Sequence, residues 1–398
     1  MPNPASWIPP LCLFVAAFAT TLAVTPLARI IAWKLGAVDY PGNRRINRSP
    51  VPRMGGIAVF CGILAAVGVQ AFGSAHLGWP IVTRPGVLSV NYPLLALAFV
   101  IIFATGAIDD VVGLKPKQKL FGQALASVIA VLGGLVIHRV VNPFTDQFFE
   151  LGWFSFPLTV VYLVAYTNII NLIDGLDGLA SGITCISSIT MFALSVSSGH
   201  PDAATLAIAM AGSTLAFLQY NFHPASIFLG DSGSLLLGFG LGTISLLSVT
   251  RIASLTTLIV PLVIVGIPII DTLSAIIRRR RAHVSIGQAD RGHIHHRLID
   301  EGFDQRQAVI VMYSWTAILS VGSIAITKVG VVYRIVIFCV LVAASAAVAW
   351  HLKLFQPVLL HHVDPETGDD ELIDPRDPSF EEEEQRLEEN EPHLFHHS

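Results

Sequence analysis

The feature that most constrains this chain is a repeated pattern of long apolar stretches. A helix needs about 20 mainly apolar residues to cross the hydrocarbon core of a bilayer. The pattern predicts an all-α polytopic membrane protein with about eleven transmembrane helices. The stretches lie at approximately residues 8–32, 54–73, 93–108, 120–138, 153–172, 178–197, 203–220, 232–250, 252–277, 308–327 and 331–351.

Composition supports the same class of protein. Of the 398 residues, 53% are hydrophobic and only 13% are charged, so a soluble protein of this size could not cover its surface. The first apolar stretch lacks a preceding basic segment and a following A-x-A-like site, which favours an anchor over a cleaved signal peptide. The four cysteines lie in apolar stretches without ligand-like spacing, so neither disulfides nor a zinc site is expected.

Lysine and arginine predict the orientation, because cytoplasmic loops are enriched in both. The loops 34–53, 109–119 and 278–307 together hold three times as many of these residues as the loops on the opposite side. We therefore expect these three loops and the C-terminus in the cytoplasm, and the N-terminus outside.

Carboxylates and histidines gather at the cytoplasmic ends of the apolar stretches rather than in their middles. Ionisable groups close to a bilayer are costly and usually functional. Several acids with glycine and histidine at one membrane face indicate a metal–phosphate site rather than a pore. The residues are Asp109, Asp110, Asp174, Asp177, Asp231, His293, His295 and His296.

The segment DDVVGLKPKQKL places Asp109 and Asp110 a few residues before three lysines. Two acids alone could simply end a helix at the interface. The lysines favour a binding site over a simple helix end, because acids can hold a cation and Lys is a flexible point charge suited to phosphate. This combination is what nucleotide-sugar chemistry requires.

Two further segments carry acids next to glycines. In NLIDGLDGLASG, Asn171, Asp174 and Asp177 recur every three residues and can share a helix face, although the glycines there also suit close helix packing. In FLGDSGS, Asp231 lies between two glycines at an expected helix start, where a carboxylate can reach a metal while N–H groups face phosphate.

The loop 278–307 opens with four arginines, typical of a positive-inside anchor, and contains HIHH. Three histidines in four residues can bind metal, contact phosphate or exchange protons. Because carboxylates are the harder ligands for Mg²⁺, phosphate contact is favoured here. Asp271, which precedes the arginines, is expected to be a structural acid.

Five segments in this order resemble the polyprenyl-phosphate N-acetylhexosamine-1-phosphate transferases: RINRSPVPRMGG, DDVVGLKPKQK, NLIDGLDGLASG, FLGDSGS and DRGHIHHRL. That family moves a sugar 1-phosphate from a UDP-sugar to a membrane polyprenyl phosphate, using about ten or eleven helices around a cytoplasmic cleft. The resemblance implies a Mg²⁺-dependent enzyme of the bacterial inner membrane with a cytoplasmic active site. Its partners would be the UDP-sugar and the lipid, not nucleic acid, and homodimer formation is left open.

Carried over by position, the resemblance assigns roles to single residues. Asp231 would bind Mg²⁺ or Mn²⁺. Asp109 and Asp110 would hold or orient the lipid phosphate, and with Asp174 and Asp177 they are the candidate catalytic acids. The residues expected to line the uridine–diphosphate site or reach its phosphates are Asn171, Asn221, Lys117, Lys119, His293, His295 and His296.

The form of the histidine motif indicates the donor. HIHHRLIDEGF resembles the branch that uses UDP-N-acetylglucosamine to start a cell-envelope glycan such as lipopolysaccharide or teichoic acid. The branch that uses UDP-N-acetylmuramoyl-pentapeptide has a longer histidine run, and it stays an alternative, as does another UDP-N-acetylhexosamine. A membrane transporter is the alternative outside enzymes, disfavoured because the acids cluster at one face and no internal repeat is evident. One residue differs from the usual pattern of the family: this chain has Asn47 where many relatives have histidine.

The chain divides into a transmembrane catalytic domain, 1–352, which includes the loop 278–307, and an acidic tail, 353–398. Between Asp364 and Glu391 the tail holds 14 acids and two arginines, which predicts a disordered cytoplasmic extension. Within the catalytic domain, direct attack by the lipid phosphate is favoured, and a covalent intermediate on Asp109 or Asp110 stays open.

Overall fold

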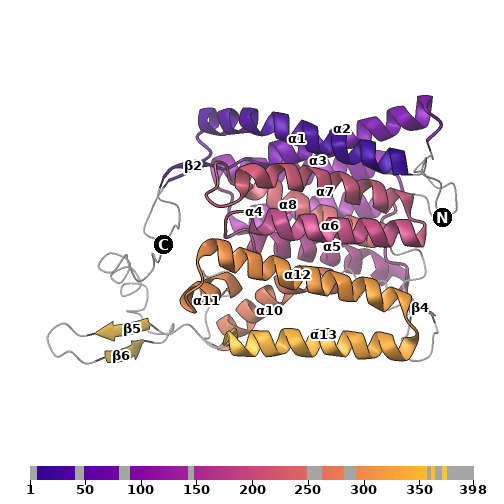
Figure 1. Ribbon diagram of the computed structural model, residues 1–398. Coiled ribbons are helices and arrows are strands. Elements are labelled where there is room, and N and C mark those ends of the chain that lie inside the picture. Colours follow the sequence, from indigo (N-terminus) through magenta and orange to yellow (C-terminus); the bar gives the residue numbers. More distant parts are fainter. Residues whose placement is uncertain are drawn as a thin grey trace.

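The computed structural model describes residues 7–40, 49–79, 90–141, 148–248, 262–281, 293–355, 360–363 and 370–373. Long helices run side by side in one bundle (Figure 1). The α-helices of the described part of the chain, of which only α11 is short, are α1 (Ile8–Leu35), α2 (Gly56–His76), α3 (Tyr92–Val112), α4 (Pro116–Leu132), α5 (Ser155–Leu172), α6 (Leu179–Ser198), α7 (Pro201–Asn221), α8 (Gly230–Ser248), α10 (Gly266–Arg281), α11 (Ile294–Asp300), α12 (Gln305–Lys328) and α13 (Val331–His351).

Strands contribute little to the described part of the chain. Three short antiparallel pairs are formed by β1 (Val38–Asp39) with β2 (Val51–Pro52), β3 (Arg139–Val141) with β4 (Phe148–Glu150), and β5 (Leu360–Val363) with β6 (Asp370–Ile373). A single turn of 3-10 helix, η2 (Gly152–Phe154), leads into α5. The expected all-α membrane architecture is therefore confirmed.

Eight of the described helices are long and apolar enough to cross a bilayer: α1, α2, α3, α5 together with η2, α6, α7, α12 and α13. Each of the eleven predicted stretches overlaps a described helix. However, α4, α8 and α10 are not among the eight, so the number of about eleven spans stays a prediction.

Helix α8 forms the centre of the bundle, and every residue from Ser232 to Leu247 is buried. It packs against α3, α5, α2, α6 and α7, while α1 and α13 lie at opposite edges (Figure 1). Glycine permits this close packing: a Cβ atom on Gly238 would lie 2.7 Å from the Thr167 Cα in α5. The buried position of α8 places its first residues deep among the helices that carry the predicted site.

Local sequence explains where several helices begin and end. The Asn91 side chain caps α3 by accepting a hydrogen bond from the Leu94 N–H at 3.1 Å. Asp304 and Gln307 form a capping box at the start of α12. Gly36 ends α1 with a φ of 73°, a backbone conformation that favours glycine.

Two details differ from the sequence-based expectations about loops and tail. The four arginines 278–281 form the last turn of α10 rather than the start of a loop, and HIHH overlaps the start of α11. Arg278 is buried and donates to the Leu354 carbonyl, which fixes the chain just after α13. Within the tail, β5 and β6 pair with Leu360 opposite Ile373, and disorder of the tail as a whole stays a prediction.

Candidate functional site

The end of α3 and the start of α4 bring together an acid and a lysine. Lys119 Nζ lies 3.1 Å from Asp109 Oδ2 and 2.8 Å from Asp231 Oδ1. The other carboxylate oxygen of Asp109 accepts a hydrogen bond from the Leu114 N–H at 2.6 Å. One partly buried ammonium group therefore links two of the acids that the sequence singled out, although they come from α3 and α8.

Asn171, near the end of α5, reaches the same point. Its amide nitrogen donates to Asp231 Oδ1 and, at 2.8 Å, to the Ser234 hydroxyl in α8. Asp231, Asp109, Lys119 and Asn171 thus form one connected group, which we call the Asp231 cluster.

Asp110 has different hydrogen-bond partners from its neighbour Asp109. It is only 2% exposed, and its two carboxylate oxygens accept backbone N–H groups of Asp231 at 2.8 Å and Ser232 at 3.0 Å. These N–H groups belong to the first turn of α8, where the helix dipole favours a negative charge. Asp110 therefore caps α8 and fixes the backbone that carries Asp231.

Glycines let other helices approach the start of α8. A Cβ atom on Gly106 in α3 would lie 2.3 Å from the Asp231 carbonyl oxygen, and one on Gly56 in α2 would lie 2.2 Å from the Gly233 nitrogen. Gly230 has a φ of 71°, and its Cβ position lies 2.7 Å from both Asp110 oxygens. No residue with a side chain would fit these positions without displacing the backbone around Asp231.

The segment before α2 runs beside the segment before α8. Gly55 donates to the Phe228 carbonyl and Gly56 to the Leu229 carbonyl, both at 3.0 Å, and Phe228 donates to the Pro52 carbonyl at 2.8 Å. Arg53 Nε also donates to the Asp110 carbonyl at 3.3 Å. The motif RMGG thus supports the motif FLGD through backbone contacts.

Asp174 lies in the turn between α5 and α6, outside the membrane-spanning helices. Burial raises its pKa well above the ordinary value, and the nearby carboxylates of Asp231, Asp110 and Asp177 raise it further, while Lys119 opposes them. Part of its surface nevertheless stays accessible. The acids around Asp174 therefore hold more negative charge than a single lysine balances, and a further cation would relieve it.

Asp177 stabilises the turn that follows α7. Its Oδ2 atom lies 2.8 Å from His223 Nδ1 and accepts the Ala225 N–H at 3.0 Å. The turn that carries Asp174 and Asp177 is itself held by Tyr313 of α12, whose hydroxyl donates to the Gly178 carbonyl at 2.6 Å. Asp177 is thus close enough to influence Asp174 but is bonded to a different segment.

In the described part of the chain, Asn221 and Lys117 form no hydrogen bond or ion pair with the Asp231 cluster. Asn221 is buried, accepts a hydrogen bond from the Ser181 hydroxyl at 2.9 Å and donates to the Ile227 carbonyl at 3.1 Å. These bonds favour a structural role for its amide. Lys117 is exposed on the first turn of α4. Substrate binding by either residue stays a prediction.

The histidine motif is tied to α10. His293 Nδ1 lies 2.8 Å from Asp271 Oδ2, and Asp271 Oδ1 accepts the Ile294 N–H at 2.7 Å. Asp271 is 1% exposed, which agrees with the expected structural acid. His295 and His296 belong to α11, but their side chains lie outside the described ones, so their contact with phosphate stays a prediction.

The donors at the Asp231 cluster are compatible with a hard divalent cation. Among the side chains that the structure describes, no three Asp, Glu, His or Cys groups converge as a complete metal cage. Mg²⁺ does not require one, because it commonly takes one or two carboxylates and completes its shell with water and substrate phosphate. Asp231 and Asp109 supply carboxylate oxygens of this kind at one point.

Several residues of the site were not singled out from the sequence. Ser234, His223, Arg53 and Tyr313 act through hydrogen bonds between segments far apart in the chain. A partly buried reciprocal amide pair, in which Asn168 donates to Gln123 at 2.7 Å, also joins α4 to α5 about one turn from the cluster. For Ser234, its position three residues after Asp231, on the same face of α8, was the available signal.

Comparison with known proteins places the chain in a family. The model of glycosyl transferase family 4 matches residues 92–249, which hold Asp109, Asp110, Lys119, Asn171, Asp174, Asp177 and Asp231. A Bacillus subtilis protein described as a probable undecaprenyl-phosphate N-acetylglucosaminyl 1-phosphate transferase is 39% identical, over 84% of this chain and 90% of its own.

Two further relatives carry related names. Decaprenyl-phosphate N-acetylglucosaminephosphotransferase of Mycobacterium tuberculosis is 35% identical over 77% of this chain and 80% of its own. Phospho-N-acetylmuramoyl-pentapeptide-transferase of Moorella thermoacetica is 33% identical over 67% of this chain and 81% of its own. With a bundle of apolar helices and the acidic cluster at the start of α8, the chain belongs to glycosyl transferase family 4.

Proposed function

We propose that this protein transfers N-acetylglucosamine 1-phosphate from UDP-N-acetylglucosamine to a polyprenyl phosphate in the bacterial cytoplasmic membrane, with release of UMP. The observation that carries the proposal is the Asp231 cluster at the ends of α3 and α5 and the starts of α4 and α8, within the segment that matches the family. The names of the B. subtilis and M. tuberculosis relatives support N-acetylglucosamine and a polyprenyl phosphate as the substrates.

The reaction must bring two anionic phosphates together. A phosphate monoester has a second pKa of about 6, so the lipid phosphate is largely dianionic at neutral pH and hardly needs a general base. One of its oxygens would form a bond to the β-phosphorus of the UDP-sugar. The bond from that phosphorus to the bridging oxygen would break, and the electron pair would leave with UMP.

Lys119 is the residue best placed to reduce the repulsion between these phosphates. Its ammonium group lies between Asp109 and Asp231, where incoming phosphate oxygens could compete with the carboxylates for its protons. Asp231, with Asp109, would hold Mg²⁺, and a bound Mg²⁺ supplies additional positive charge to the diphosphate. Asn171 would orient the Asp231 carboxylate.

The geometry of the acids favours direct transfer over a covalent intermediate. Both oxygens of Asp110 accept N–H groups of α8, and both oxygens of Asp109 have partners, Leu114 N–H and Lys119. A carboxylate that attacked phosphorus would lose the negative charge that these donors stabilise. In the direct scheme both acids keep that charge.

The proposal is tested by measuring UMP release from purified protein in detergent with undecaprenyl phosphate and Mg²⁺. UDP-N-acetylglucosamine and UDP-N-acetylmuramoyl-pentapeptide serve as donors in parallel, and Asp231→Asn is the control variant. Lipid-dependent UMP from the first donor, lost in the variant, is the expected result. Release from the pentapeptide donor alone would move the protein to the other branch, and no release from either would contradict the proposal.

A further inference from the structure

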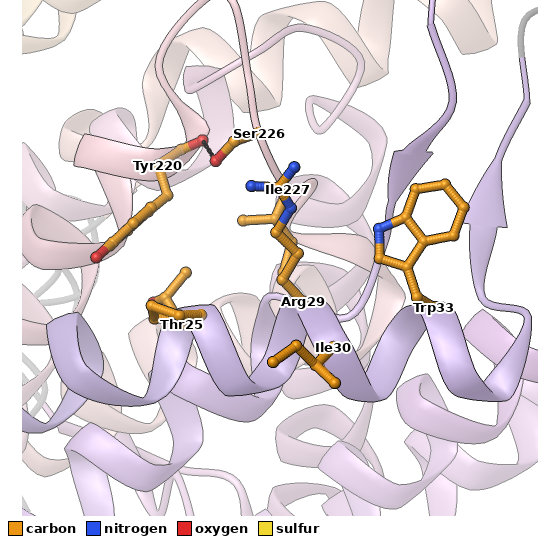
Figure 2. Close-up of a pocket in the computed structure, with 8 residues that line it drawn as sticks. Thr25, Arg29, Ile30, Trp33, Tyr220, Ser226 and Ile227 are labelled. Atoms are coloured by element: carbon orange, nitrogen blue, oxygen red, sulfur yellow. Dashed lines mark hydrogen bonds between the residues drawn. The ribbon is translucent and has the colours of Figure 1, made fainter.

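A groove of about 350 Å³ lies between α1 and the end of α7, apart from the Asp231 cluster. Figure 2 shows Arg29 extending from α1 between Tyr220 and Trp33, toward the segment that carries Ser226 and Ile227. The remaining lining residues are Thr25, Pro26 and Ile30. The groove therefore combines an apolar floor, two aromatic side chains and one cationic group.

The groove lies at the level of the lipid headgroups. Helix α1 has 28 residues, so its length of about 42 Å exceeds the hydrocarbon thickness of about 30 Å. Arg29 is six residues before the end of α1, on the side followed by the basic loop 34–53. Trp33 and Tyr220 are residue types that gather at the membrane interface. Arg29 is thus placed at the cytoplasmic surface of the bilayer.

Within the described part of the chain, no carboxylate forms an ion pair with Arg29, and the lining of the groove contains no acid. Ile30 is 52% exposed and Trp33 45%, so the groove opens toward lipid rather than into the bundle. Guanidinium groups bind phosphate oxygens in a planar, bidentate manner. The charge and the apolar wall together match an anionic lipid.

The groove does not suit the lipid substrate. Helix α1 packs against α2 and α7, whereas the Asp231 cluster is built by α3, α4, α5 and α8. A phosphate held by Arg29 would be separated from Lys119 by the helices in between. The occupant must therefore be a lipid that does not react.

We propose that the groove between α1 and α7 binds the headgroup of an anionic glycerophospholipid of the cytoplasmic leaflet, with its phosphate on Arg29 and its chains along Ile30 and Trp33. The bound lipid stabilises the turn that leads from α7 to α8. Tyr220 already ties this turn to α1, because its hydroxyl donates to the Leu22 carbonyl at 3.3 Å and its carbonyl accepts the Ser226 N–H at 2.8 Å. Ile227 is three residues before Gly230, so the lipid would stabilise the chain close to the start of α8.

The test measures binding of phosphatidylglycerol to delipidated protein by native mass spectrometry, without turnover. Arg29→Gln should weaken binding about tenfold, the effect of losing one charge-assisted contact. Lys34→Gln is the matched control, since it removes the same charge from the exposed end of the same helix, outside the groove. It should change binding by less than about twofold. Arg29→Lys should retain part of the affinity.

Thermal unfolding provides a second measurement. Phosphatidylglycerol should raise the Tm of the native protein and of Lys34→Gln, and raise it much less for Arg29→Gln. Equal binding by Arg29→Gln and native protein would overturn the proposal, as would equal losses in Arg29→Gln and Lys34→Gln. Displacement of phosphatidylglycerol by equimolar undecaprenyl phosphate would identify the substrate lipid as the occupant and would also overturn it. None of these outcomes depends on the proposed reaction.

Discussion

Asp110 Oδ1 accepts the backbone N–H of Asp231 at 2.8 Å, although 121 residues separate the two acids in the chain. Its second oxygen accepts the next N–H, that of Ser232. Of two adjacent acids at the end of α3, one therefore contacts Lys119 and the other holds the start of α8. The pair Asp109-Asp110 combines a polar group of the site with a buried helix cap.

Asp110→Ala should destabilise the protein by about 3 kcal/mol, because two buried N–H groups lose a charged acceptor. Asp304→Ala, at the exposed capping box of α12, provides the comparison and should cost about 1 kcal/mol. Thermal unfolding in detergent measures both. A loss in Asp110→Ala no larger than in Asp304→Ala would show that Asp110 does not support α8.

Gly230→Ala should reduce both stability and turnover. The substitution requires a φ of 71° at a non-glycine residue and places a Cβ atom 2.7 Å from the Asp110 oxygens. Gly36→Ala is a matched control, since its φ is 73° but nothing lies within 4 Å of the Cβ position. Both variants should lose about 1–2 kcal/mol from the backbone conformation.

Only Gly230→Ala should also lose activity, because only this position contacts the residues that fix Asp231. The measurement is the specific activity of Gly230→Ala relative to that of Gly36→Ala, at a temperature where both variants are folded. If Gly36→Ala loses as much activity as Gly230→Ala, backbone strain alone explains the effect and the contact with Asp110 is unimportant.

Lys119→Gln should lower kcat/KM about 100-fold, the typical effect of removing one group that stabilises charge in a transition state. Lys117→Gln is the comparison on the same helix: Lys117 is exposed and pairs with no acid in the described part of the chain. We expect its loss to change kcat/KM no more than about threefold, and the variant therefore also tests the phosphate contact predicted for Lys117. Steady-state kinetics with both substrates varied makes the comparison. Similar losses in the two variants would argue for a general electrostatic effect of α4.

His293 and Asp271 should be coupled in stability. The variants His293→Gln and Asp271→Asn each break the same buried contact, so the double variant should be more stable than the sum of the single losses predicts, by about 1–2 kcal/mol. The combination of Asp271→Asn with His76→Gln, at the end of α2, should be additive. An additive result for Asp271 and His293 would contradict the contact.

The positions of the helices followed directly from the sequence, because apolar length is a local property. The eleven predicted stretches all overlap helices, and the acids lie at their ends as expected. Apolar length is less informative for α8, whose buried surface is covered by other helices and does not need to be as apolar as a lipid-facing one.

The sequence predicted which residues form the cluster, but it did not predict which of them contact one another. The role of Asp110 depends on where α8 begins relative to α3, and the role of Asp177 depends on the turn after α7. Both are settled by packing between distant segments, which no local pattern encodes. Asn221 illustrates the same limit: its sequence position is close to the site, yet its amide is bonded to Ser181 and Ile227.

The most direct test of the account follows the β-phosphate of the donor. Purified protein is incubated with undecaprenyl phosphate, Mg²⁺ and UDP-N-acetylglucosamine that carries a radioactive β-phosphate, and lipid and nucleotide are then separated. Transfer of the sugar 1-phosphate predicts that the label moves to the lipid and that unlabelled UMP appears in equal amount. Label that stays in the nucleotide as UDP while the sugar moves to the lipid would contradict the account.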